Sequence, residues 1–205
     1  MSTLERDIQF ARSLAESGQR APLLGGRFLV WWGAMVGVAY GLQFLLLQNA
    51  AVVPPTAFSW LWGGFAVLAP AGYWLLGRRY PFHLPGSGSN ANQTDRIVWA
   101  MSGLMVLSIV LGVTLRVLLG DRPEGVFPWT VPSVFGGFAI ALLTTGQVSA
   151  NGVVKGAGFV SLMLVIACIV FLDGPSLYAI ASAGAIVTLV LPGVILWRRE
   201  SRSVD

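Results

Sequence analysis

Residues suited to catalysis or metal binding are few in this sequence and lie far apart. It contains one histidine, His83, and one cysteine, Cys168. A single histidine cannot complete a haem or metal site, and a single cysteine forms neither an intrachain disulfide nor a thiolate ligand set. The sequence also lacks a Gly-x-Ser-x-Gly elbow, a phosphate-binding loop, a dinucleotide fingerprint and a zinc motif. We therefore expect no catalytic residue, no cofactor and no metal, and we predict that the chain is not an enzyme.

The acidic residues point the same way. Asp95 and Asp173 are expected at opposite ends of the helices, so they cannot act together as acid and base. No acidic residue falls in the middle of an apolar segment, which argues against a transporter that relays protons through carboxylates. An enzyme acting on lipid would need a polar cluster at one membrane surface, and we rank this hypothesis lowest. The residues available for such a cluster are Arg78, His83, Asp95 and Asn151.

The composition is that of an integral membrane protein. Of the 205 residues, 55% are hydrophobic and 11% charged, with a mean hydropathy of +0.73. Soluble domains carry about 25% charged residues, so this chain has too little polar surface to remain in water. The net charge of +4 would suggest nucleic acid in a soluble protein. Here the basic residues flank apolar segments, so we interpret them as topology signals and expect no nucleic-acid partner.

Six apolar segments are close to the roughly 20 residues that a helix needs to cross a hydrocarbon core. We predict six transmembrane helices, arranged as three hairpins, at 27–48, 56–77, 97–118, 129–149, 156–172 and 177–197. Pro70 and Pro192 lie inside two of these segments and should bend them. The longest connection, 78–96, contains a Gly-, Ser- and Asn-rich stretch, 85–93, that we predict to be a mobile loop.

An amphipathic pattern precedes the first segment. Leu4, Ile8 and Ala11 recur at helical spacing, while charged residues occupy the rest of the helical wheel. The predicted fold class is therefore an all-α integral membrane protein with six transmembrane helices and a short cytoplasmic amphipathic helix before them. The expected organisation is an N-terminal helix and linker (1–26), a transmembrane domain (27–197) and a cytoplasmic tail (198–205).

The distribution of Lys and Arg predicts the orientation. Most basic residues fall on the side of the two termini, and one of the few exceptions is Arg122 in the third connection. The positive-inside rule then places both termini in the cytoplasm. The eight tryptophans agree, because they lie near segment ends, as in interfacial belts. We expect a bacterial inner (plasma) membrane protein.

Small residues spaced four apart predict close helix packing. Gly33, Gly37 and Gly41 share one side of the first segment, and small residues let two helix backbones approach closely in a membrane. They could form a homo-oligomer interface or a groove for another helix of the same bundle. With five other helices available, we favour packing within the bundle.

A short internal similarity links two segments. Gly63-Gly64-Phe65-Ala66 in the second segment recurs as Gly136-Gly137-Phe138-Ala139 in the fourth. Because Gly, Phe and Ala are common in membrane helices, we favour chance similarity, and repeated hairpins are the alternative.

Two further features are candidates for polar contacts. Arg116 lies near the end of its segment, where it can reach the headgroups as an anchor or contribute, with Trp129, to an anion or lipid-headgroup site. The polar stretch 144–151 could line a cavity, but its hydroxyls more often bond back to helix carbonyls.

The sequence therefore supports hypotheses rather than a specific activity. We expect a non-enzymatic accessory, scaffolding or regulatory membrane subunit, whose partners are the lipid bilayer and a protein bound through the N-terminal helix. The alternative is a small transporter or channel for a neutral or apolar solute, motivated by the two prolines and the polar stretch.

Overall fold

The computed structural model describes residues 23–79, 87–120 and 126–201, together with Arg6 and Gln9. All regular elements in these ranges are helical. They are α2 (Gly26–Gln48), α3 (Thr56–Arg79), α4 (Asn90–Leu118), η1 (Phe127–Trp129), α5 (Thr130–Val148), α6 (Gly152–Val170), α7 (Ser176–Ala185), η2 (Ile186–Val190) and α8 (Leu191–Ser201). The predicted N-terminal amphipathic helix lies outside the described residues, apart from two isolated positions.

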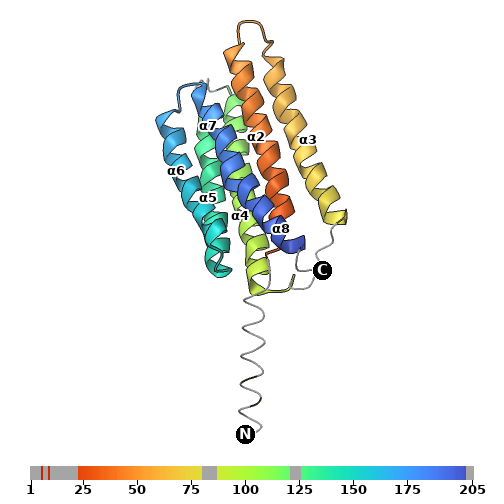
Figure 1. Cartoon of the computed structure of the whole chain (residues 1–205). Helices are drawn as coiled ribbons and strands as arrows, with labels where there is room; N and C mark the ends of the chain where they lie inside the picture. Colours follow the sequence, from red (N-terminus) through yellow and green to blue (C-terminus); the bar gives the residue numbers. More distant parts are fainter. Residues whose placement is uncertain (1–5, 7–8, 10–22, 80–86, 121–125, 202–205) are drawn as a thin grey trace.

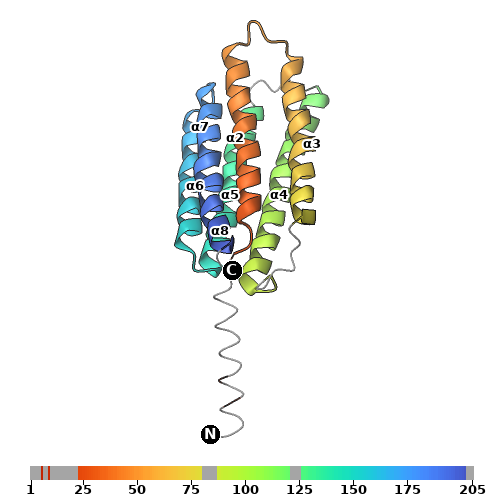
Figure 2. The same ribbon diagram turned by 45° about the vertical axis from the view of Figure 1, so that its right-hand side comes forward.

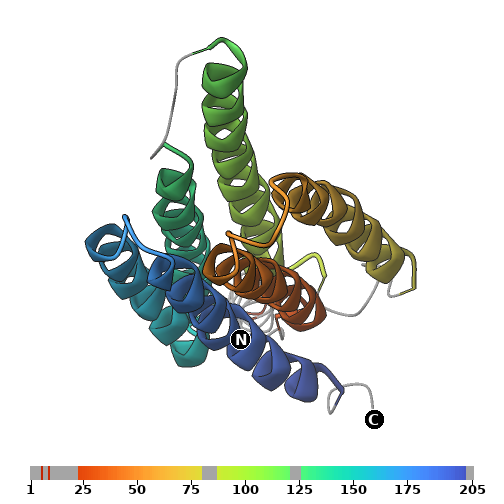
Figure 3. The ribbon, with the colours of Figure 1, turned by 90° about the horizontal axis from the view of Figure 1, so that it is seen from above.

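The helices form an arc of antiparallel neighbours (Figures 1 and 3). Packing partners follow one another in the order α3, α2, α7–η2–α8, α6, α5 and α4, so α3 and α4 stand at the two ends of the arc. Figure 2 shows α2 between α3 and α7. In this arrangement α2 packs against α3 on one side and against α7, η2 and α8 on the other.

One end of the bundle is basic, and we call it the basic end. It is the end at which α2 begins and α8 finishes (Figure 1). The described basic residues that helix direction places there are Arg27, Arg78, Arg79, Arg96, Lys155, Arg198 and Arg199. Arg116, in the last turn of α4, lies near the opposite end.

Five helices in the described ranges are long and apolar enough to cross a membrane. They are Gly26–Gln48, Asn90–Leu118, Phe127–Val148, Gly152–Val170 and Ser176–Glu200. The chain is thus an all-helical protein of multi-pass membrane type, as predicted. The expected sixth crossing falls on α3, whose 24 residues exceed the required length. However, its Trp, Tyr, Gly and Pro residues make α3 less apolar than the other five.

The loop predicted over 85–93 was wrong in its second part. Residue Ser89 caps α4, its Oγ accepting a hydrogen bond from the backbone N–H of Asn92 at 3.3 Å. Because a serine at this position satisfies a free N–H group of the first turn, the helix starts at Asn90, earlier than the predicted 97. Residues 80–86 of this connection lie outside the described ranges.

The last crossing contains a π-helical turn just before Pro192. Leu191 donates its N–H to the carbonyl of Ile186, five residues earlier, within a helix that continues from α7 through η2 to α8. Proline has no N–H and its ring would clash with the carbonyl four residues before it, so a wider turn relieves the conflict. The helix then extends to Ser201, into the region predicted as the tail.

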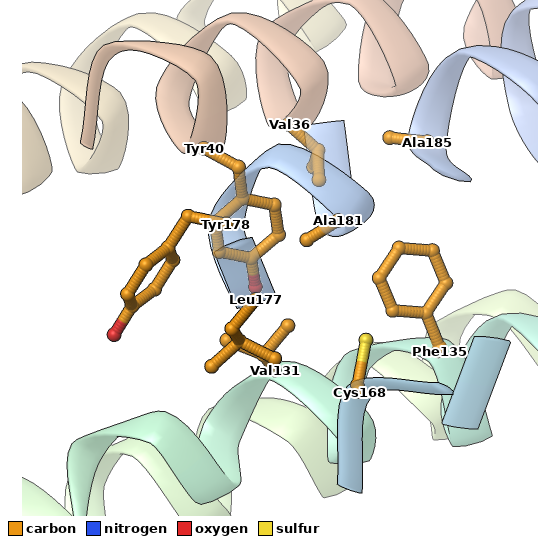
Figure 4. Packing of buried hydrophobic residues seen from close by; sticks show 9 residues of the cluster. All are labelled: Val36, Tyr40, Val131, Phe135, Cys168, Leu177, Tyr178, Ala181 and Ala185. Carbon is orange, nitrogen blue, oxygen red and sulfur yellow. The ribbon is translucent and has the colours of Figure 1, made fainter. Parts of the chain in front are cut away.

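One hydrophobic core lies where α2, α5, α6 and α7 meet (Figure 4). Cys168 is fully buried there, as expected of a small apolar residue. The other members are Val36, Tyr40, Val131, Phe135, Leu177, Tyr178, Ala181 and Ala185. This core fixes α2 against the second half of the chain and leaves α3 and α4 at the periphery.

Candidate functional site: the strap and its polar cluster at the basic end

The most distinctive polar site lies where the chain enters α2. Residues 23–26, which we call the strap, lead into α2 between α4 and α8. Four buried or half-buried polar side chains surround the strap and the helices beside it, and we call them the polar cluster: Asn92, Asp95, Thr145 and Glu200. Because no other part of the described bundle gathers polar side chains from α4, α5 and α8, we take this as the candidate site.

Two side chains hold the backbone of the strap. The amide oxygen of Asn92 accepts the N–H of Leu24 at 3.0 Å, and Oε1 of Glu200 accepts the N–H of Gly26 at 3.0 Å. Both side chains belong to residues only 5% exposed. The N–H of Gly26, the first residue of α2, has no partner within the helix, so Glu200 takes the place of a capping residue, while Asn92 holds the chain just before the helix. The result is that α4 and α8 are both fastened to the start of α2.

Close packing reinforces the contact with α8. A Cβ on Gly26 would lie 2.5 Å from the backbone nitrogen of Trp197 and 2.8 Å from the carbonyl oxygen of Gly193. Nothing larger than glycine fits this approach. The neighbouring Arg27 lies with its Nε 3.9 Å from Glu200 and its guanidinium 5.6 Å from the Trp197 ring centroid. The Glu200 carboxylate therefore has both a backbone donor and a cation beside it, which offsets its burial.

Asp95 occupies the other side of the cluster. Its carboxylate accepts a hydrogen bond from Thr145 Oγ1 at 2.9 Å, which joins α4 to α5. A Cβ on Gly25 of the strap would lie 3.1 Å from the Asp95 carboxylate, so the strap covers this carboxylate closely.

The polar cluster is suited to holding the strap and its neighbouring helices in place. Its oxygen atoms accept hydrogen bonds from the strap and from neighbouring helices, and its one hydroxyl, on Thr145, donates to the Asp95 carboxylate. Within the part of the chain that the structure describes, no three His, Cys, Asp or Glu side chains gather where they could hold a metal ion. The arrangement is suited to holding three helices and the strap in one geometry.

The glycines predicted to pack helices lie against the last crossing. A Cβ on Gly33 would be 2.7 Å from Leu189 Cβ, and one on Gly37 would be 3.5 Å from Ile186 Cγ1. The third, Gly41, faces Ser182, whose hydroxyl also donates to the Gly37 carbonyl at 2.7 Å. In the structure this face of α2 is therefore occupied by α7 and η2.

The other predicted site residues are dispersed. Arg116 and Trp129 share the end opposite the strap, one in the last turn of α4 and the other at the end of η1. His83 lies outside the described residues. Arg78 stacks its guanidinium 3.8 Å from the Trp74 ring centroid, and Asn151 caps α6 by accepting the N–H groups of residues 153 and 154.

The polar stretch 144–151 was expected either to line a cavity or to bond back to helix carbonyls, and its residues differ in what they do. Ser149 donates its hydroxyl back to the Thr145 carbonyl at 2.6 Å, whereas Thr145 reaches across to Asp95. The stretch thus contributes Thr145 to the polar cluster, while Ser149 bonds back to its own helix.

Sequence reasoning missed the two residues that hold the strap. Glu200 was assigned to the tail, yet it continues the buried face of the last helix at positions 189, 193, 196 and 200, a spacing that could have revealed it. Asn92 was placed in the mobile loop, although Ser89 three residues before it is a helix-start signal. No protein-family model, curated protein or solved structure matches the chain.

Proposed function

We propose that the chain is a non-enzymatic multi-pass protein of a bacterial inner membrane, acting as an accessory, scaffolding or regulatory subunit. The observation that carries this proposal is the strap. Any protein bound by the N-terminal residues pulls on a segment fastened by buried side chains to α4 and α8. A docking element anchored in this way is what a subunit that transmits binding to its membrane helices requires.

The orientation follows from the charge distribution. With the basic end in the cytoplasm, most Lys and Arg residues lie on the cytoplasmic side, as the positive-inside rule requires, and both termini are cytoplasmic. In this arrangement α3 supplies the sixth crossing. Single cysteines at Val52, which is 86% exposed in the α2–α3 connection, and at Gln93 test the topology. A membrane-impermeant maleimide added to intact cells should label Val52→Cys alone; labelling of Gln93→Cys alone would reverse the orientation.

The docking role is tested by deletion. Removing residues 2–18 leaves the strap and the described bundle intact, and it should release proteins that co-purify with the full chain in mild detergent. A chain lacking residues 202–205 serves as the matched control and should retain them. If the 2–18 deletion retains every co-purifying protein, the docking role is refuted.

The alternative, a small transporter or channel for a neutral or apolar solute, draws support from one feature. The π-helical turn Ile186–Val190 is of a kind frequent at functional sites. Flux of neutral solutes into liposomes that contain the purified protein tests this alternative, and flux equal to that of empty liposomes would remove it.

A further inference from the structure

The strap is held differently at its two ends. Gly26 is buried against α8, where a Cβ on Gly193 would lie 2.9 Å from the Gly26 carbonyl oxygen. Leu24 and Gly25, just before it, are half-buried and belong to no helix. Leu24 is held through its N–H, which the Asn92 side chain of α4 accepts at 3.0 Å. The strap therefore meets α8 backbone to backbone and α4 through side-chain contacts.

The first residue of the strap, Leu23, adds apolar contact. It is 6% exposed and belongs to a hydrophobic cluster near the basic end. Other members of this cluster are Ala91 of α4, Leu142 of α5 and Leu196 of α8, and Trp99 of α4 packs against it. The strap thus links α4 and α8 through apolar packing as well as through hydrogen bonds.

Among the described helices, α4 depends most on the strap. It packs extensively against one helix, α5, and its buried residues are Ala91, Asn92 and Ser102. Two of these three lie at the strap. The hydrogen bond from Thr145 to Asp95, which joins α5 to α4, is also beside the strap. Without the strap, α5 would be the main support for the basic end of α4.

The last crossing is held more firmly. It packs on α2 from α7 through η2 to α8, and close approaches at Gly26, Gly33 and Gly193 bring the two backbones together. Packed surfaces of this kind are not continuously deformable, because small shifts create overlap. Of the two helices that the strap joins, α4 is therefore the one with freedom to move.

We propose that residues 23–25 form a latch that lifts from α4 while Gly26 stays against α8, so that its release lets the basic end of α4 move away from α8. Gly25 is the pivot, because it lies between the two anchored N–H groups and glycine has the backbone freedom that a hinge needs. Lifting also uncovers the Asp95 carboxylate, which Gly25 now covers closely.

The trigger of the latch rests on the proposed function. A protein bound by the N-terminal residues pulls on the chain just ahead of Leu23. Such a partner shifts the equilibrium only by the ratio of its affinities for the lifted and the closed strap. The latch therefore has an equilibrium of its own, which can be measured without any partner.

Hydrogen exchange in the unmodified full chain tests the pivot. Leu24 donates its N–H to α4 and Gly26 donates its N–H to α8, so a lifting latch exposes the first amide and not the second. After correction for intrinsic exchange rates, the Leu24 amide should exchange at least about tenfold faster than the Gly26 amide, equivalent to roughly 1.4 kcal/mol. Equal rates would mean that the strap opens as one unit and would overturn the proposal.

Distances between spin labels in lipid vesicles test the movement of α4. Asn92→Leu removes the acceptor of the Leu24 N–H, and labels at Gln93→Cys on α4 and Arg198→Cys on α8, both exposed positions, report the separation of the two helices. The population with a longer distance should rise by about tenfold, the effect of one lost hydrogen bond. Asn92→Asp keeps an oxygen acceptor and should restore the original distance. Labels at Lys155→Cys and Arg198→Cys should not change their separation.

Asn151→Leu is the matched control. Asn151 also accepts backbone N–H groups near the basic end, but its hydrogen bonds cap α6 and do not hold the strap. The protein without added cysteines is the labelling blank, because Cys168 is buried. The α4–α8 distance should stay unchanged in Asn151→Leu. An equal lengthening in both leucine variants would indicate general loosening and would overturn the latch.

The two proposals fail separately. An unchanged α4–α8 distance in Asn92→Leu overturns the latch, and the docking role still stands if the 2–18 deletion releases its partners. A longer distance in Asn92→Leu supports the latch even if the 2–18 deletion releases no protein, in which case the docking role is refuted.

Discussion

Two glycine faces on neighbouring helices have opposite surroundings. On α2, Gly33 approaches so closely to the last crossing that a Cβ would lie 2.7 Å from Leu189. On α3, Gly63 and Gly64 meet nothing within 4 Å. Both faces present small residues at helical spacing and both belong to helices long enough to span a membrane. The difference shows that small-residue spacing predicts a capacity for close approach, while the position of the helix in the arc decides which surface is used.

The consequence for stability is direct. A face filled within the chain contributes to folding of the monomer, and an open face contributes only to what binds it. Substitutions at the two sets of glycines should therefore separate into those that unfold the bundle and those that leave it folded.

The largest effect is expected at the filled face. Gly33→Leu would force a side chain into the Leu189 and Val190 contact, and overpacking of this kind costs about 3 kcal/mol. Reversible unfolding by SDS in mixed micelles should show this loss, and Gly63→Leu is the control at the open face. Equal stability of the two variants would remove the distinction between the faces.

A somewhat smaller effect is expected where α3 joins α2. The Trp31 ring lies over Gly72, where a Cβ would overlap ring atoms, and its indole N–H donates to the Ala69 carbonyl at 2.9 Å. We expect Gly72→Ala to destabilise the α2–α3 contact by about 2 kcal/mol. The same unfolding measurement on Gly72→Ala combined with Trp31→Leu should recover part of the loss, because the two residues share one contact. An additive double variant would contradict this contact.

The strap should show an intermediate effect of a different kind. Glu200→Ala leaves the buried N–H of Gly26 without its acceptor, which costs about 1.5 kcal/mol. Glu200→Gln retains an oxygen acceptor and should lose less. Hydrogen exchange at the Gly26 amide measures the contact itself, with faster exchange expected in Glu200→Ala. If Gln and Ala substitutions speed exchange equally, the hydrogen bond does not hold the strap.

Much of the fold could be predicted, because the length of an apolar segment and the basic residues beside it both follow from crossing a membrane. The helices at 27–48, 129–149 and 156–172 lie within a few residues of α2, α5 and α6. The start of α4 could not be read the same way, because a Gly- and Ser-rich sequence resembles a loop until Ser89 is recognised as a cap. α3 has the length of a crossing, but it is not among the five helices that are apolar enough to span a membrane by composition.

The candidate site was harder to predict because it depends on contacts between residues far apart in the chain. Glu200 and Gly26 are separated by 174 positions, and Asp95 and Thr145 by 50. Charge near a helix end predicts exposure in most membrane proteins. Only the packing of the strap against α8 explains why a carboxylate at that position is buried.

The smallest effect on the free energy of unfolding is expected from Gly63→Ala, at the open glycine face of α3. The added methyl group meets no atom of the monomer, so the free energy of unfolding should change by no more than about 1 kcal/mol, and in the stabilising direction, because alanine favours helix over glycine. Unfolding of Gly63→Ala in SDS mixed micelles, measured beside the wild-type protein, checks this expectation. A destabilised monomer would mean that α3 turns its glycines toward the bundle, and the two faces would then no longer differ.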